Sequence, residues 1–129
     1  MSALKEQVAG SHYKKLSYQP VQLTYELGGS PLFCKVAKYL TREKDSVTQQ
    51  LEKARHCVRL EKEFITERTR YYMVVMIDPK EEGIPQIERF AKQFKEEQFI
   101  YDVLCCTYLG YLDTAEKLIS EMLGEGDSQ

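Results

Sequence analysis

Signals that start and stop helices recur along this chain, and they constrain the fold more than any other feature. Pro20 suits the first position of a helix, and Gly28-Gly29 ends that segment. Ser30-Pro31 supplies an N-cap followed by a first-turn proline, and Ser46 and Gln49 have the spacing of a capping box. These signals predict helices from Pro20 to Gly28, from Pro31 to about Glu43, and from Ser46 to at least Thr66.

Apolar residues recur at helical spacing inside these segments, as expected of helices that bury one face. In the second helix the stripe consists of Phe33, Val36, Ala37 and Leu40. In the third it includes Val47, Leu51, Ala54 and Phe64. The first half of the chain is therefore expected to form a small helical core.

The second half of the chain contains helix start and stop signals of the same kind. Pro85 opens a fourth helix whose apolar face carries Ile87, Phe90, Ala91 and Phe94. A fifth helix is expected from Phe99 to Leu109, ended or bent by Gly110. Asp113 can cap a sixth helix that runs to Leu123.

The fold class follows from these segments: an all-α bundle of five or six helices in a single domain over residues 1–129. Residues 71–77 are ambiguous, because their aromatic and β-branched content would also suit a short strand. Residues 1–9 and 124–129 are expected to be mobile. We find no internal repeat.

Composition excludes several classes of protein. Hydrophobic residues make up 43% of the chain and charged residues 29%, as in ordinary soluble domains. The net charge of −2 argues against a surface for nucleic acid over the whole protein. No apolar run is long enough to cross a membrane, and the first residues lack the apolar stretch of a signal peptide, so a cytoplasmic location is expected. Four cysteines without a C-x-x-C pair and only two histidines predict reduced thiols and no metal site.

Four short motifs carry a resemblance to a known family. In order they are Gly10-Ser11-His12-Tyr13-Lys14, Tyr18-Gln19-Pro20-Val21, Lys38-Tyr39-Leu40-Thr41-Arg42 and Gln50-Leu51-Glu52-Lys53-Ala54. Their order and spacing over about residues 10–64 resemble a small bacteriophage domain family whose members are often called phage nucleotide kinases. The resemblance implies a phage protein of the infected bacterial cytoplasm that transfers a phosphoryl group to a deoxynucleoside monophosphate. It also implies a nucleoside triphosphate donor, with or without magnesium. Residues 65–129 show no such resemblance and are expected to complete the core or support oligomerisation.

The second helix carries a row of cations. Lys35, Lys38 and Arg42 lie at i, i+3 and i+7, so they share one face, and such a face can cradle phosphate. The alternative is a solvated basic face paired with acids such as Glu52 or Glu61. The resemblance favours the phosphate site for Lys38 and Arg42, which match the family motif, and adds Lys53 as a third cation.

Other candidate ligand contacts lie in the same motifs. His12 could donate to a phosphate or act as an acid or base, and Tyr13 could stack on a base or bond to a sugar. The alternative is that this pair pins the loop against the helices. Tyr39 adjoins the basic face and could instead belong to the core. Gln49 and Gln50 could read a base edge by hydrogen bonding.

Two departures from the family pattern bear on catalysis. Gln50 stands where the family usually has an acid, and Lys35-Val36 replaces a common Gly-Asn. The chain has no G-x-x-x-x-G-K-[ST] loop and no clear acidic pair for magnesium. Three hypotheses stay open: a kinase-like phosphotransferase, a protein that sequesters a nucleotide such as a host defence signal, and a helical protein-interaction module. The aromatic residues between Phe90 and Tyr111 suit either core packing or a homo-oligomer interface.

Overall fold

The computed structural model describes residues 3–5, 15–43, 46–71 and 83–125 of the chain, and six α-helices lie in these ranges. After a short 3-10 turn at Ala3–Lys5 they are α1 (Pro20–Leu27), α2 (Pro31–Thr41), α3 (Val47–Tyr71), α4 (Ile84–Ala91), α5 (Glu97–Leu109) and α6 (Leu112–Met122). No strand occurs in these ranges, which confirms the all-α prediction. Of the ambiguous residues 71–77, Tyr71 is the last residue of α3, and the others lie outside the described residues.

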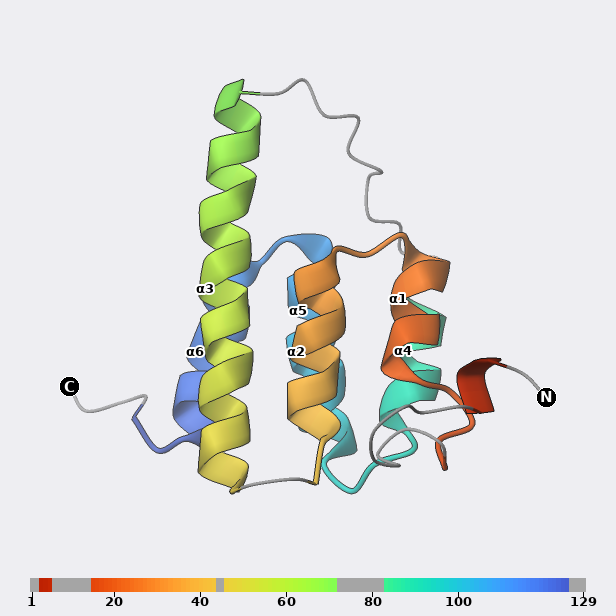
Figure 1. The fold of residues 1–129 in the computed structure, drawn as a ribbon. Coiled ribbons are helices and arrows are strands. Elements are labelled where there is room, and N and C mark those ends of the chain that lie inside the picture. The colour runs from red at the N-terminus through yellow and green to blue at the C-terminus, as the bar shows by residue number, and fades with distance from the viewer. Residues whose placement is uncertain (1–2, 6–14, 44–45, 72–82, 126–129) are drawn as a thin grey trace.

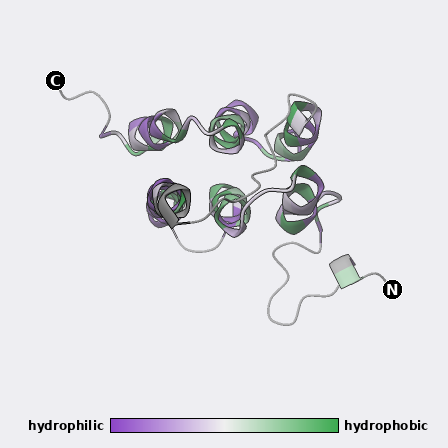
Figure 2. Ribbon diagram, turned by 90° about the horizontal axis from the view of Figure 1, so that it is seen from above, coloured by the Kyte–Doolittle hydropathy of each residue, from purple (hydrophilic) through white to green (hydrophobic). Residues whose placement is uncertain are grey.

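The helices form two layers of three (Figure 2). One layer contains α1, α2 and α3 side by side, and the other contains α4, α5 and α6. Across the layers α1 contacts α4, α2 contacts α5, and α3 contacts α6. Successive helices in each layer run in opposite directions (Figure 1). The core therefore lies between the layers, where each helix turns its apolar stripe toward its partner.

Most residues of the predicted apolar stripes are buried, but the prediction is wrong for Val47 and Phe64 of α3, which are 75% and 49% exposed. Phe33, Val36 and Ala37 of α2 are buried, whereas Leu40 is only partly buried. The largest fully buried side chains are Tyr18, Phe90, Leu23, Ile87, Ile100, Leu104 and Ile119. Each buried side chain of this kind contributes about 1.5–3 kcal/mol relative to an exposed one.

Core packing accounts for several aromatic residues of the second half. Phe90 is fully buried, and its ring centroid lies 6.3 Å from that of Tyr18 and 5.2 Å from that of Phe94. The Tyr108 ring packs edge-on against Phe33, with the centroids 6.3 Å apart. Tyr111 is 63% exposed. The predicted homo-oligomer stays a prediction.

The predicted helix ends are confirmed in the first half of the chain. The Ser30 and Ser46 hydroxyl oxygens accept backbone hydrogen bonds, each at 3.0 Å, from residues three positions later. Gly28 follows α1 with a φ of 65°, a conformation that favours glycine. Helix α2 ends at Thr41, two residues before the predicted end.

The predicted cap of the last helix is wrong. Helix α6 begins at Leu112, so Asp113 is its second residue rather than its N-cap. The reason lies at the end of α5, where Gly110 has a φ of 93° and the Tyr111 N–H donates to the Cys106 carbonyl at 2.8 Å. This closure turns the chain early, and the Asp113 carboxylate pairs with the Lys62 ammonium instead.

Among the described residues, no helix combines the length and the apolar character needed to cross a bilayer.

Candidate functional site

Six of the eight residues predicted to form a site lie where α2 ends and α3 begins. Lys38, Tyr39 and Arg42 occupy the last turn of α2 and its C-cap, and Gln49, Gln50 and Lys53 occupy the first two turns of α3. The two helices pack side by side, so the residues share the lower end of the bundle in Figure 1. His12 and Tyr13 lie outside the described residues.

A contact between the two helices joins two of the predicted residues. The Lys53 ammonium of α3 lies over the Tyr39 ring of α2, 5.6 Å from its centroid. Both side chains are partly exposed. This is a cation–π contact near the outer limit of distance, and such exposed contacts contribute about 0.5–1 kcal/mol. It places a cation of α3 beside the basic end of α2.

Arg42 is the most unusual residue of this group. It follows the last turn of α2 with an extended backbone, and its side chain is partly exposed. Its Nε is nevertheless buried and has no hydrogen-bond partner among the described residues. Buried polar groups nearly always have a partner, so an exception calls for an explanation. An anion beside this guanidinium would supply the missing acceptor.

The two glutamines have different surroundings. Gln49 is exposed, so its amide lies where a base edge could be read. Gln50 is only 3% exposed. The side chain is therefore covered by its neighbours, as is the Nε of Arg42.

Of the two acids considered as partners of the basic face, Glu61 lies elsewhere, whereas Glu52 directly precedes Lys53 in α3. Glu61 accepts a hydrogen bond at 3.0 Å from the Ser30 hydroxyl, just before the first residue of α2. Arg42 lies at the opposite end of that helix. Glu52 is exposed.

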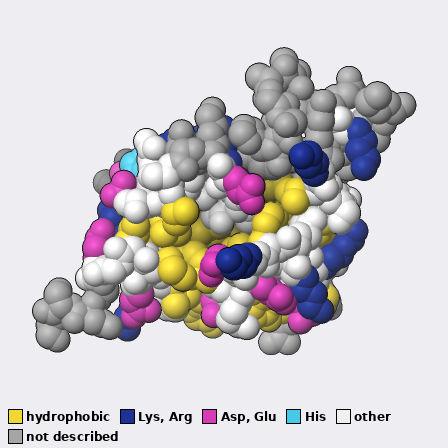
Figure 3. All heavy atoms as spheres, turned by 90° about the horizontal axis from the view of Figure 1, so that it is seen from below, with side chains coloured by type: hydrophobic (Ala, Val, Ile, Leu, Met, Phe, Trp, Pro, Cys, Tyr) yellow, Lys and Arg dark blue, Asp and Glu magenta, His cyan; other side chains and the backbone are white. Residues whose placement is uncertain are grey.

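Figure 3 views the bundle from below, at the end that carries the predicted site. Hydrophobic side chains form a band across this face, with charged side chains around it. Leu40, Phe94, Phe99 and Leu123 are partly buried residues at or near helix ends of this side of the bundle. The predicted cations and these apolar side chains thus lie at the same end of the bundle, a combination that suits a ligand with both a charged and an apolar part.

The sequence Tyr18-Gln19-Pro20 has a structural role. Tyr18 is fully buried, Gln19 is buried at the N-cap of α1, and Pro20 is the first residue of that helix. The Arg89 guanidinium of α4 lies 4.0 Å from the Tyr18 ring centroid. The Tyr-Gln-Pro sequence thus anchors the chain before α1 and contributes to the fold rather than to a surface site.

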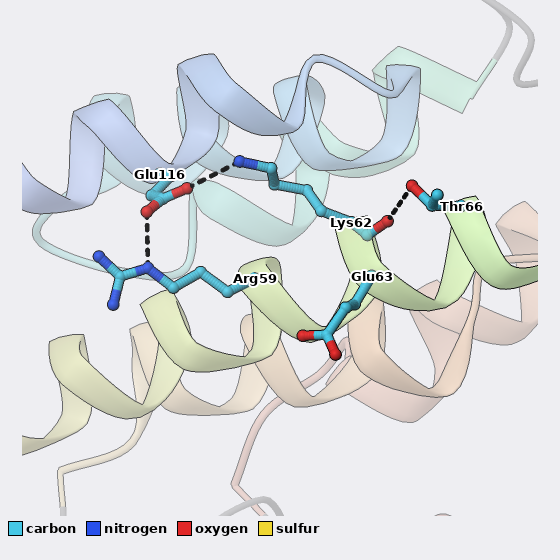
Figure 4. A pocket seen from close by; sticks show the side chains of 5 residues that line it. All are labelled: Arg59, Lys62, Glu63, Thr66 and Glu116. Atoms are coloured by element: carbon cyan, nitrogen blue, oxygen red, sulfur yellow. Dashed lines mark hydrogen bonds and ion pairs between the residues drawn. The ribbon is translucent and has the colours of Figure 1, made fainter.

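The hollow of about 470 Å³ in Figure 4 lies away from these residues. It is lined by Arg59, Lys62, Glu63, Thr66 and Glu116, from α3 and α6. The Glu116 carboxylate lies between two cations, at 2.6 Å from Arg59 Nε and 3.2 Å from Lys62 Nζ. Its pKa is lowered, chiefly by the hydrogen bond from Arg59. The hollow is shallow, and Arg59 and Lys62 are already paired with Glu116, so it serves the packing of α6 on α3 better than the binding of a ligand.

The sequence reasoning missed this row of charges. Arg55, Arg59 and Lys62 recur along one side of α3 at i, i+4 and i+7, which was a detectable signal. Arg55 also bonds to Glu125 at 2.6 Å and to the Ser120 hydroxyl at 3.0 Å. The three cations of this row form ion pairs with acidic residues of α6 and with Glu125, which follows α6.

The described ranges show no cluster of metal ligands, and the Cys105 thiol is unsuited to nucleophilic attack at neutral pH. No group of three or more His, Cys, Asp or Glu side chains there could hold a metal ion. All four cysteines are free, and burial raises the pKa of Cys105 to about 11. A thiol with a raised pKa is a poor nucleophile at neutral pH.

Comparisons with models of known families, with curated proteins and with solved structures find no match to this chain. The similarity of residues 10–64 to the bacteriophage family therefore stays an expectation.

Proposed function

We propose that this protein binds a phosphorylated small molecule, foremost a nucleotide, at the end of the bundle where α2 meets α3. The observation that carries the proposal is the buried Arg42 Nε, which lacks an acceptor among the described residues. Phosphate oxygens are the acceptors that a guanidinium fork fits best, together with carboxylates.

Two further cations support phosphate as the ligand group. Lys38 lies one helical turn before Arg42, and Lys53 joins from α3 beside Tyr39. The whole chain carries a net charge of −2, so a local group of cations would attract anions to this end of the molecule in particular.

The same residues favour binding without chemical conversion. Transfer of a phosphoryl group normally requires carboxylates that hold magnesium or orient the attacking hydroxyl. The predicted set contains no carboxylate, and Gln50, at the position of the family's acid, is buried. Sequestration of a nucleotide therefore fits these residues better than the kinase activity that the resemblance implies.

The test is a thermal-shift screen of the full chain against nucleoside mono-, di- and triphosphates and cyclic dinucleotides, with and without magnesium. A ligand at one hundred times its dissociation constant should stabilise the fold by about 2.7 kcal/mol. Chromatography of the recovered ligand should return it unchanged, whereas conversion in the presence of a triphosphate would establish the kinase.

Matched variants locate the site. Arg42→Gln and Lys53→Gln should abolish the shift while circular dichroism shows unchanged helical content. Lys117→Gln is the control, because Lys117 is an exposed lysine of α6 in the other layer. Equal binding by all three variants would place the site elsewhere, and no shift with any nucleotide would contradict the proposed function.

A further inference from the structure

We infer that this site selects a terminal phosphate over an internal phosphodiester, and that Arg42 determines the selection. The inference rests on the proposed function and specifies the chemical class of its ligand. It separates a mononucleotide from a cyclic dinucleotide, in which each phosphate is esterified twice.

The donor geometry of Arg42 is the first step. A guanidinium offers Nε and a terminal nitrogen as two parallel donors to two oxygens of one anion. The Nε half of this fork is the buried, unpartnered atom, so a full bidentate contact requires an oxygen to reach it. A terminal phosphate can present two oxygens to the fork and still keep a third, since a phosphate monoester has three acceptor oxygens.

The third oxygen of a terminal phosphate can be bound by Lys53. Lys53 is held beside the end of α2 by its contact with Tyr39, and an ammonium is a compact donor that can meet one further oxygen. Lys38 adds a further positive charge one turn before Arg42. A phosphodiester has only two unesterified oxygens and a single negative charge. Its two free oxygens would both bind the Arg42 guanidinium, and no unesterified oxygen would remain for Lys53.

The charge of the phosphate group also favours a monoester over a diester. A phosphate monoester carries about 1.5 to 2 negative charges at pH 7, because its second pKa is near 6. The monoester thus carries nearly one more negative charge than the diester, and this extra charge is attracted by three cations. The preference for the monoester should therefore be large, and it should decrease as the monoester takes up its proton below about pH 6.

The probes are inorganic phosphate and dimethyl phosphate, which are small, lack a base and differ in charge and free oxygens. Nitrogen-15 spectra of the full chain report the side-chain Nε–H signals of arginine, which Arg42→Lys assigns. We expect inorganic phosphate to shift the Arg42 signal and to bind at least about tenfold more tightly than dimethyl phosphate. Its affinity should fall between pH 7 and pH 5.5, while that of dimethyl phosphate stays constant.

A substitution that keeps the charge tests the fork. Arg42→Lys should retain weak phosphate binding and lose the preference over dimethyl phosphate, whereas Lys117→Arg should change neither. Equal affinities of the two probes in the unaltered chain would overturn the inference and leave the proposed function intact. Retention of the full preference by Arg42→Lys would overturn the role of Arg42. If neither probe nor any nucleotide binds, both the inference and the proposed function fail.

Discussion

The side-chain amide of Gln93 pairs with both backbone polar groups of Tyr18. The Tyr18 N–H donates to Gln93 Oε1 at 3.1 Å, and Gln93 Nε2 donates to the Tyr18 carbonyl oxygen at 2.8 Å. Gln93 follows the end of α4, and Tyr18 precedes α1, so the pairing joins the two layers of the bundle at one edge. It holds Tyr18 in place just before the first helix.

Replacement of Gln93 should destabilise the protein. In Gln93→Ala the partly buried N–H and carbonyl of Tyr18 lose their partner, which we expect to lower the free energy of unfolding by about 1–3 kcal/mol. Urea unfolding followed by circular dichroism measures this. Gln98→Ala is the control, because its hydrogen bond to Asp102 is exposed and its loss should cost less than about 0.5 kcal/mol. If the two variants lost equal free energy of unfolding, the pairing with Tyr18 would contribute no more to stability than an exposed hydrogen bond.

Tyr18 should make the stability depend on pH in alkaline solution. Burial, followed by the hydrogen bond to Glu26, raises the Tyr18 pKa well above its ordinary value of 10.0. The folded chain thus keeps a proton that the unfolded chain loses, so this contribution is complete below about pH 10 and is lost as the pH rises further. Between pH 10 and 11 the unaltered chain should lose up to about 1.4 kcal/mol more than Tyr18→Phe. Parallel pH profiles of the two chains would contradict this.

Glu116 should give a dependence of the opposite sign in acid. Its pKa lies below the ordinary 4.5, chiefly because of the hydrogen bond from Arg59, with Lys62 as a second donor. Its contribution is therefore present above about pH 4.5 and is lost as the pH falls. Glu116→Gln should lower the free energy of unfolding at pH 7 by about 0.5–1 kcal/mol, a difference that diminishes as the pH falls below 4.5 and shrinks in high salt. A difference that stays constant as the solution is acidified would mean that packing, rather than charge, is responsible.

The sequence predicted the helices well because their signals are local. Ser30 and Ser46 cap their helices through atoms three residues away, and the α2 stripe needs only helical spacing. Asp113 failed as a cap because the closure of α5 through Tyr111 and Cys106 set the start of the next helix.

The candidate site was only partly predictable, for a related reason. Spacing could group Lys38 with Arg42 on one helix, but the meeting of Tyr39 with Lys53 depends on how two helices pack. The burial of Gln50 and the role of Tyr18 depend on tertiary contacts in the same way. No pattern in the sequence predicts that the Nε of Arg42 is buried without a partner among the described residues.

The most direct test of the account is a nitrogen-15 NMR titration of the full chain with the nucleotide that gives the largest thermal shift. We expect the signals of residues 38–42 and 49–53 to move together with one dissociation constant, while those of Arg59, Lys62 and Glu116 stay fixed. Shifts centred on the α3–α6 hollow, or no saturable shift at all, would contradict the claim that the end of the α2–α3 pair is the binding site.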